Sequence, residues 1–125
     1  MVDIGGVGPT EAVMCLFCKI AKKEIPSKVL FEEDDLLAFH DINPMAPIHV
    51  LVIPKQHIVG LGEAVVENAE VLGKLLVATR RVAEETGLVQ SGFRVVVNNG
   101  PHAGQSVFHL HVHVLGGRPL AWPPG

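Results

Sequence analysis

The sequence lacks clustered positive charge and long apolar runs, and each absence excludes a class of protein. It holds 10 Lys and Arg residues against 13 Asp and Glu, for a formal net charge of −3. The basic residues are scattered, whereas a protein that binds duplex nucleic acid needs a basic patch. No apolar run approaches the length of about 20 residues that a membrane span requires. The sequence therefore predicts neither duplex nucleic acid nor a membrane as a partner.

The N-terminal stretch also lacks the features of a secretory signal peptide. It carries Asp3 and Glu11, and it has neither a basic start nor an apolar central segment. We therefore expect the protein in the cytoplasm, with the nucleus as the alternative.

Cysteine is scarce: the chain has two, Cys15 and Cys18, spaced C-x-x-C. In a chain without an export signal, this spacing indicates metal or redox chemistry more than a structural disulfide. One pair supplies half of a zinc site, and His57 and His109 are candidates for the other half. Buried free thiols and a redox pair are the alternatives, the second being disfavoured without a βαβ context.

Aromatic residues make up only 5% of the chain, but hydrophobic residues as a whole reach 48% and include many Val and Leu. This composition can build one solid core in 125 residues, so we expect a single domain over residues 14–125. Residues 1–13 contain three glycines and a proline without periodicity, which predicts a flexible tail.

Hydrophobic periodicity predicts the elements of this domain. A short helical pattern covers residues 15–23, and a long one covers residues 63–86 and ends at Gly87. Five strands are expected, at residues 28–31, 36–41, 49–54, 93–98 and 108–115. The first two form a hairpin around an acidic turn. Five mostly sequential strands with one long helix make an α+β domain with an antiparallel sheet.

The last predicted strand is the most informative stretch, because His alternates with apolar residues throughout it. Alternate side chains of a strand share a face, so His109, His111 and His113 lie on one face and the apolar residues on the other. His109 and His113 are then about 13 Å apart at their backbones. One ion cannot easily hold all three, since metal–imidazole bonds are about 2 Å long, so the histidines must have different roles. The alternative, a half-exposed strand whose polar face happens to be His, is disfavoured because three of the seven histidines are in register.

The loop before this strand offers groups that suit a phosphate. Gly104, Gln105 and Ser106 provide unhindered backbone N–H groups, one amide and one hydroxyl beside the imidazoles. Asn98, at the end of the preceding strand, is near enough in sequence to reach the same place. An anion site next to a nucleophilic or acid–base imidazole fits phosphoryl or nucleotidyl transfer. The alternative is an ordinary tight connection whose glycines serve the turn geometry.

These motifs together resemble the histidine triad (HIT) superfamily. Residues 109–115 match its His-φ-His-φ-His-φ-φ signature, where φ is apolar. Residues 39–42, 49–57 and 104–109 and the C-terminal Trp-Pro-Pro-Gly are similar to the nucleotide-binding (Hint) branch, and the cysteine pair to its zinc-containing members. The resemblance implies the HIT fold and a homodimer in which two five-stranded sheets join. It also implies binding of purine nucleoside monophosphates and hydrolysis of purine nucleoside 5′-phosphoramidates, such as adenosine 5′-phosphoramidate or AMP-lysine.

The resemblance further implies a role for each site residue. His111 is the nucleophile that takes the nucleotidyl group, and its other ring nitrogen donates to a backbone carbonyl. His113 holds phosphate oxygens, and His49 supports the proton chemistry. The remaining expected nucleotide contacts are Phe17, Phe39 and Ile42 around the base, Asp41 at the ribose, and Asn98, Gly104, Gln105 and Ser106 at the phosphate. A structural zinc is implied on Cys15, Cys18, His57 and His109.

The C-terminal tail holds the single Trp, Trp122, beside three prolines. It stands too late in the chain to join the core easily, so a second subunit is its simplest partner. A nucleotide- or protein-binding scaffold with a vestigial site and a metal-storage or zinc-sensing module are the competing functions. The complete set of motif histidines with Asn98 and Ser106 favours the hydrolase, because a scaffold is free to lose His111.

Overall fold

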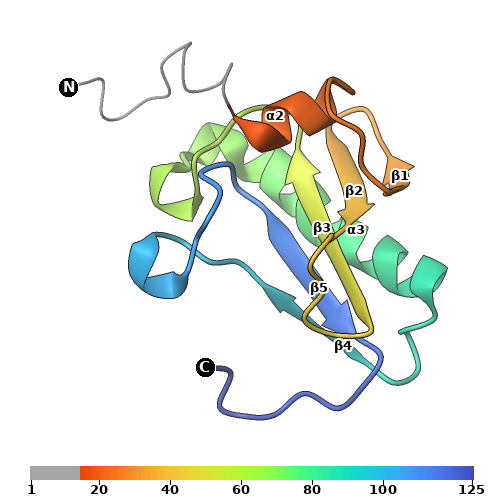
Figure 1. Cartoon of the computed structure of the whole chain (residues 1–125). Helices are drawn as coiled ribbons and strands as arrows, with labels where there is room; N and C mark the ends of the chain where they lie inside the picture. The colour runs from red at the N-terminus through yellow and green to blue at the C-terminus, as the bar shows by residue number, and fades with distance from the viewer. Residues whose placement is uncertain (1–14) are drawn as a thin grey trace.

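The computed structural model describes residues 15–125 of the chain (Figure 1). The predicted flexible tail over residues 1–13 lies outside the described residues. Five antiparallel strands form one sheet in the order β1-β2-β3-β5-β4. The strands are β1 (Val29–Glu32), β2 (Leu36–His40), β3 (Ile48–Pro54), β4 (Phe93–Val96) and β5 (Val112–Gly116). The predicted α+β class with a five-stranded antiparallel sheet is therefore confirmed.

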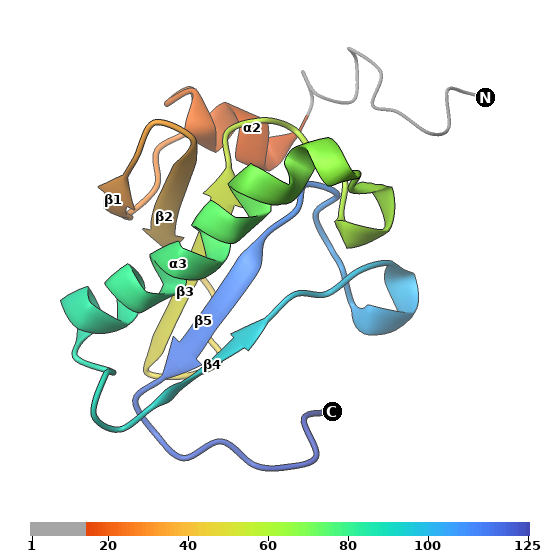
Figure 2. The ribbon, with the colours of Figure 1, turned by 180° about the vertical axis from the view of Figure 1, so that it is seen from behind.

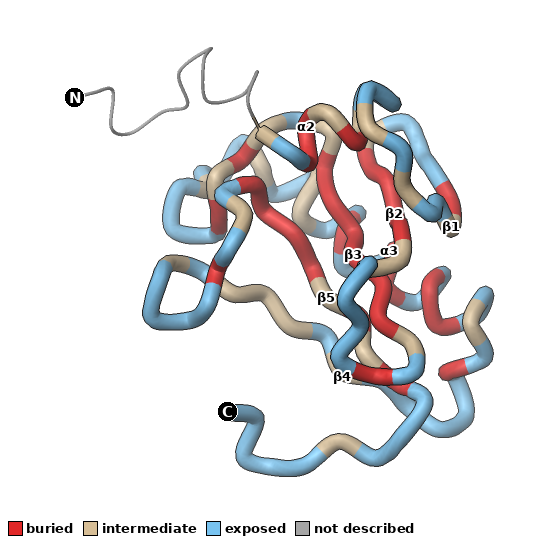
Figure 3. Tube along the Cα trace, in the orientation of Figure 1, coloured by how far each residue is buried: buried red, intermediate tan, exposed pale blue. Residues whose placement is uncertain are grey.

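Each face of the sheet carries its own apolar cluster. The long helix α3 (Ala69–Thr86) covers one face (Figure 2). Its cluster includes Leu75, Ala78, Val82, Val50, Val52, Leu110, Val112 and Val114. The short helix α2 (Leu16–Ala21) covers part of the other face. The second cluster consists of Phe17, Ile20, Leu37, Phe39, Leu51 and Ile53. Because β3 contributes to both clusters, it is buried on both faces, and Figure 3 shows buried residues along β2, β3 and β5.

The long helix begins later than predicted. Two 3-10 turns, η1 (Leu61–Glu63) and η2 (Val66–Asn68), precede it, and regular α-helix starts at Ala69. The side-chain oxygen of Asn68 accepts the backbone N–H of Val65 at 2.9 Å. Such a local bond offers the backbone an alternative to the helix, which explains the delayed start.

The other helix ends lie within two residues of their predicted positions. The short helix is shorter than predicted, and Cys15 is its N-cap, with Sγ accepting the N–H of Cys18 at 3.4 Å. The long helix ends at Gly87, as predicted, in the left-handed conformation with φ of 79°. Glycine adopts this conformation without the steric cost that a Cβ imposes. Among residues 15–125, no helix is long and apolar enough to cross a membrane.

The histidine strand also begins later than predicted, at Val112 instead of residue 108. Its partner β3 ends at Pro54, which has no N–H to continue a ladder. The N–H of Leu110 instead donates to the carbonyl of Ile58 at 2.6 Å. The predicted alternation survives this change, because Leu110 lies in the α3-side core while the histidine at 109 contacts Phe17 on the other side.

Candidate functional site

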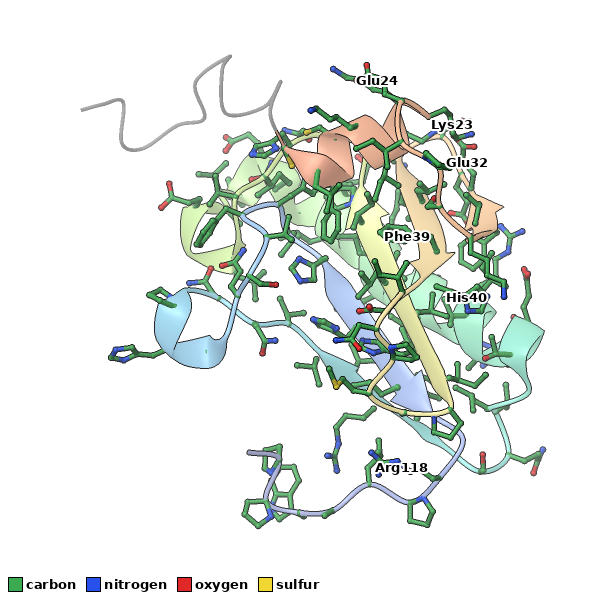
Figure 4. The ribbon with its side chains drawn as sticks, in the orientation of Figure 1. Lys23, Glu24, Glu32, Phe39, His40 and Arg118 are labelled. Atoms are coloured by element: carbon green, nitrogen blue, oxygen red, sulfur yellow. The ribbon has the colours of Figure 1, made fainter. Side chains whose placement is uncertain are left out.

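A cavity of about 290 Å³ opens on the face of the sheet that α2 covers. Figure 4 shows Phe39, one of its lining residues, on this face. Its lining residues are Leu16, Phe17, Ile20, Ile25, Pro26, Ser27, Phe39, His40, Asp41, Ile42, Leu51, Ser106, Val107, His111 and His113. A larger hollow of about 590 Å³ lies outside α3, but its lining contains neither His nor Cys and its charges are ion-paired. The smaller cavity is therefore the candidate site, because its lining includes histidines.

His111 presents an unprotonated nitrogen to this cavity. Its Nδ1 lies 2.7 Å from the carbonyl oxygen of His109, which can only accept, so Nδ1 carries the proton. The neutral ring therefore has its lone pair on Nε2. The ring of Phe17 meets that of His111 edge-on, with centroids 5.1 Å apart, and restrains its orientation. The hydrogen bond that the resemblance implied for the nucleophile is thus present.

His49 and His113 form a hydrogen-bonded pair whose direction the backbone fixes. The N–H of Met45 donates to Nδ1 of His49 at 3.0 Å, so the proton of neutral His49 is on Nε2. That Nε2 lies 2.9 Å from Nδ1 of His113 and 3.5 Å from a carboxylate oxygen of Asp41. His113 therefore accepts through Nδ1 and carries its own proton on Nε2. This Nε2 is buried, without a hydrogen-bond partner among residues 15–125, in a side chain that lines the cavity.

Burial keeps both of these rings neutral. It lowers the pKa of His113 to about 4, and the neighbouring His111 and His49 lower it further. Burial also lowers the pKa of His49, against the opposing effect of the Asp41 carboxylate. Near neutral pH, the pair therefore keeps one N–H, on Nε2 of His113, that no group among residues 15–125 accepts.

A second group of side chains has the donors of a zinc site. One ligand atom each from Cys15, Cys18, His57 and His109 can be chosen so that all four lie within 4.8 Å of one another. Nδ1 of His109 is 3.4 Å from Sγ of Cys15 and 3.5 Å from Sγ of Cys18, and Nδ1 of His57 is 3.0 Å from Sγ of Cys18. In a tetrahedral zinc site with ordinary bond lengths, sulfur and nitrogen ligands are about 3.6 Å apart. The spacing therefore fits that ion.

The protonation of this group also fits a cation. Nε2 of His109 donates to the carbonyl of Pro54 at 2.8 Å, so the lone pair on Nδ1 faces the thiols. Burial raises the pKa of Cys18 to about 11, and the neighbouring Cys15 raises it further. A cation would reverse that effect, because metals bind the thiolate form.

Asp41, His49 and His113 also lie within 4.8 Å of one another, but their protonation does not suit a cation. To bind a metal through Nε2, His49 would need its proton on Nδ1, where the Met45 N–H already donates. We therefore describe this group as a hydrogen-bonded relay.

Two of the predicted phosphate-binding residues, Gly104 and Gln105, form hydrogen bonds within their own loop and to its neighbours. The amide of Gln105 is buried, donates to the carbonyls of Val59 and Val107, and accepts the N–H of Gly100. The backbone N–H groups of Gly104 and Gln105 donate within the same loop. The expected nest is therefore closed at these two N–H groups, because that of Gly104 donates to the carbonyl of Pro101 in a 3-10 turn and that of Gln105 donates to the carbonyl of Gly100. Sequence alone does not reveal that the amide points inward.

The remaining predicted residues divide into three groups. Ser106, Phe17, Phe39, Asp41 and Ile42 line the cavity together with two of the histidines. Asn98 does not line it; it stands two residues after the end of β4 and forms no side-chain hydrogen bond within residues 15–125. Trp122 is 78% exposed, with the Arg94 guanidinium 5.8 Å from its ring centre.

Two backbone groups of the site were not predicted, the N–H of Met45 and the carbonyl of Pro54. Neither has a signal in the sequence, since every residue except proline carries both groups. The extra lining residues include Leu51, which β3 places opposite His113. Leu51 stands two residues after His49 in the third strand, so the two side chains share a face, and this spacing is the signal by which Leu51 could have been found.

Comparison with known proteins agrees with this geometry. Residues 22–120 match the model of the HIT domain. The chain is 53% identical to the 14 kDa zinc-binding protein of Zea mays, covering 88% of this chain and 87% of that one. It is 50% identical to Adenylylsulfatase HINT1 of Arabidopsis thaliana, covering 88% of this chain and 76% of that one. The crystal structure of a HIT family hydrolase from Legionella pneumophila superposes with a TM-score of 0.87 at 47% identity, covering 89% and 99% of the two chains.

The HIT domain matches most of the chain, the relatives share about half of its residues, and a solved HIT structure has the same fold. These findings agree on one assignment. Two of these relatives are themselves named as enzymes, one as an adenylylsulfatase and one as a hydrolase. This chain belongs to the HIT domain family.

Proposed function

We propose that the protein hydrolyses purine nucleoside 5′-phosphoramidates through a covalent nucleotidyl intermediate on His111. One observation carries the proposal. In a single cavity, the ring of His111, unprotonated at Nε2, lies beside the ring of His113, protonated at Nε2, with centroids 5.0 Å apart. A nucleophile next to a hydrogen-bond donor suits attack on a phosphorus whose oxygens gain negative charge.

In the first step, Nε2 of His111 attacks the α-phosphorus, so a nitrogen–phosphorus bond forms while the bond to the leaving nitrogen breaks. The N–H of His113 donates to a phosphate oxygen and stabilises the charge that develops there. The leaving amine must take up one proton. Ser106 lines the cavity and is exposed to solvent, so its hydroxyl can donate that proton and regain one from water.

In the second step, water attacks the phosphorus, the bond to His111 breaks, and the nucleoside monophosphate leaves. One proton of the attacking water returns to solvent, so the two steps together consume one water. In both steps the carbonyl of His109 accepts a hydrogen bond from Nδ1–H of His111 and stabilises the positive charge on the nucleotidylated ring.

The nucleoside is held by the rest of the cavity. Phe17 and Phe39, edge-on to each other at 5.6 Å between centroids, offer apolar surface for the base, with Ile42 at the rim. The carboxylate of Asp41 accepts the N–H of Asn43 and keeps capacity for a ribose hydroxyl.

Cys15, Cys18, His57 and His109 would hold a zinc ion. Bound by four protein ligands, it would have no open position and would serve to tie the α2 segment to the end of β3. Phe17 lies in that segment, between the two cysteines, so the site supports the base pocket indirectly.

Adenylyl sulfate is a second candidate substrate, favoured by the name of the Arabidopsis thaliana relative. Sulfate departs as a stable anion without a proton, whereas an amine needs one. Ser106→Ala should therefore slow the phosphoramidate reaction more than the adenylyl sulfate reaction. Equal slowing of both would remove Ser106 from the proton step.

The deciding experiment is incubation with adenosine 5′-phosphoramidate, followed by rapid acid quench and intact-mass measurement. The expected result is a nucleotidyl adduct in the wild-type protein and none in His111→Gly. Absence of both adduct and AMP from a folded, zinc-loaded sample would favour the binding-scaffold function instead.

The proposal includes a homodimer, as the resemblance implies. In the described sheet, β4 is an edge strand, and Phe93 and Val95 on it are 38% and 36% exposed. Leu76 and Val77 on α3 are 57% and 73% exposed. A second copy paired along β4 would cover such an edge, with Trp122 within reach of the partner. Sedimentation as a monomer at micromolar concentration would contradict the dimer.

A further inference from the structure

The loop between β2 and β3 is held at both backbone groups of one residue, Met45. Its N–H donates to Nδ1 of His49 at 3.0 Å, and its carbonyl accepts from Nη2 of Arg118 at 3.0 Å. Arg118 stands in the C-terminal tail, two residues after the end of β5, and Figure 4 shows it on the same side of the molecule as this loop. Its other terminal nitrogen donates to the carbonyl of Pro119 at 3.0 Å, so the guanidinium is fixed by its own tail.

A second contact brings the tail against the loop. Gly117 has φ of 94°, and a Cβ built on it would lie 2.8 Å from Cβ of Pro47. Only glycine allows this approach, because any side chain would collide with the proline and would also strain the backbone. Met45 itself is 62% exposed, so packing of its own side chain does little to hold it in place. The hydrogen bond from Arg118 and the approach of Gly117 to Pro47 are therefore supports that the tail gives to this part of the loop.

We infer that Arg118, acting through the backbone of Met45, is a positioning residue that sets the tautomers of His49 and His113. The N–H of Met45 requires an acceptor at Nδ1 of His49, which puts the His49 proton on Nε2. That proton in turn requires an acceptor at Nδ1 of His113, which puts the His113 proton on Nε2 of a ring that lines the cavity. Each link is a donor facing an acceptor, so displacing Met45 removes the constraint on both rings.

The consequence for catalysis rests on the function proposed above. With the opposite tautomers, Nε2 of His113 would present a lone pair to the phosphate oxygens and repel them. The loss would be greatest in the transition state, where those oxygens carry the most charge. Loss of Arg118 should therefore lower kcat more than it raises KM.

The test reads the tautomers directly in the ligand-free protein. Long-range proton–nitrogen NMR of the histidine rings should show wild-type His49 and His113 with the proton on Nε2. Arg118→Ala should show mixed tautomers for both rings, and Arg118→Lys should restore part of the wild-type pattern. Arg80→Ala, which removes an exposed arginine of α3, and Met45→Ala, which keeps both backbone groups, are the matched controls and should match the wild type.

Met45→Pro removes the N–H itself and should reproduce the effect of Arg118→Ala more strongly. Wild-type tautomers in folded Arg118→Ala would overturn the inference, whatever the activity and whether or not the proline variant folds. With the phosphoramidate as substrate, we expect kcat of Arg118→Ala to fall about tenfold with KM changed less than about twofold, about 1.4 kcal/mol in the barrier. Because the NMR result needs no substrate, failure of the proposed function would leave this test intact.

Discussion

Two pairs of histidines lie on either side of His111, and they differ in which backbone group holds them. At the His57 and His109 pair, a carbonyl, that of Pro54, accepts the outer ring proton and leaves a lone pair facing two thiols. At the His49 and His113 pair, an N–H, that of Met45, donates to the outer nitrogen and sends the ring proton inward. A carbonyl at the outer position therefore leaves a lone pair that suits a cation beside the thiols, and an N–H there leaves a hydrogen-bond donor. The backbone contact of each pair determines whether the inner nitrogen can accept or donate.

Removing His111, which lies between the two pairs, should have the largest effect on turnover. We expect His111→Gly to reduce turnover by about a thousandfold or more, because no other side chain of the cavity presents a fixed unprotonated imidazole nitrogen. Affinity for AMP should change less than about tenfold, or about 1.4 kcal/mol, since most of the cavity is untouched. Single-turnover kinetics and calorimetry measure the two quantities. His102→Gly, in an exposed 3-10 turn, is the matched control, and wild-type turnover in His111→Gly would refute the nucleophile.

Removing the two thiols beside the His57 and His109 pair should lower the stability of the fold more than the catalytic activity. Cys15→Ser combined with Cys18→Ser should abolish zinc binding and lower Tm by about 5–10 °C. Activity should survive at a reduced level, because neither cysteine lines the cavity and their effect on it passes through neighbouring residues of α2, such as Phe17. Elemental analysis and calorimetry give the first two quantities. Complete inactivity of the folded variant would show that the ion is catalytic instead of structural.

Acid should lower the stability of the fold through the His49 and His113 pair. The pKa of His113 is lowered to about 4 in the folded protein, against an ordinary value near 6.5, so the unfolded chain binds more protons between these values. Stability should therefore be full above about pH 6.5 and should fall as the pH drops toward 4, by a few kcal/mol at most. Thermal unfolding from pH 4.5 to pH 7.5 measures this change. His113→Asn should have a shallower profile, and an unchanged profile would show that His113 does not contribute.

The smallest expected effect concerns the stoichiometry of metal binding, since we expect no second cation at Asp41, His49 and His113. Because the Met45 N–H blocks the required tautomer of His49, zinc should bind the wild-type protein at one equivalent per chain in calorimetry. Asp41→Asn should leave that stoichiometry unchanged. A second equivalent, lost in Asp41→Asn, would show that the relay group also binds metal and would break the comparison.

The sequence predicts side chains and their faces better than it predicts backbone contacts. The alternation from His109 to Val114 determines which residues enter the α3-side core, and that prediction is confirmed. The start of β5 was wrong by four residues, because it depends on the bond from Leu110 to Ile58, more than fifty positions away. Local periodicity contains no information about such a bond.

The same distinction applies to the candidate site. Cys15, Cys18, His57 and His109 lie together, as the resemblance implied. Gln105, which the motif placed at the phosphate, turns inward to hold its own loop, because a polar side chain can bind backbone as readily as ligand. The direction of the His49 and His113 pair depends on a backbone N–H that every residue except proline would supply at position 45.

Phe17 would join two binding equilibria, that of a metal ion on the thiols and that of a nucleotide in the cavity. It stands between Cys15 and Cys18 in sequence and contacts Phe39 and His111 in the cavity. Coupling between two ligands is reciprocal: if an ion on the thiols favours a nucleotide against Phe17, the nucleotide must tighten the ion by the same factor. Purine nucleotides would then slow the loss of zinc to a chelator, and the rate of zinc exchange would report how often the base pocket is filled.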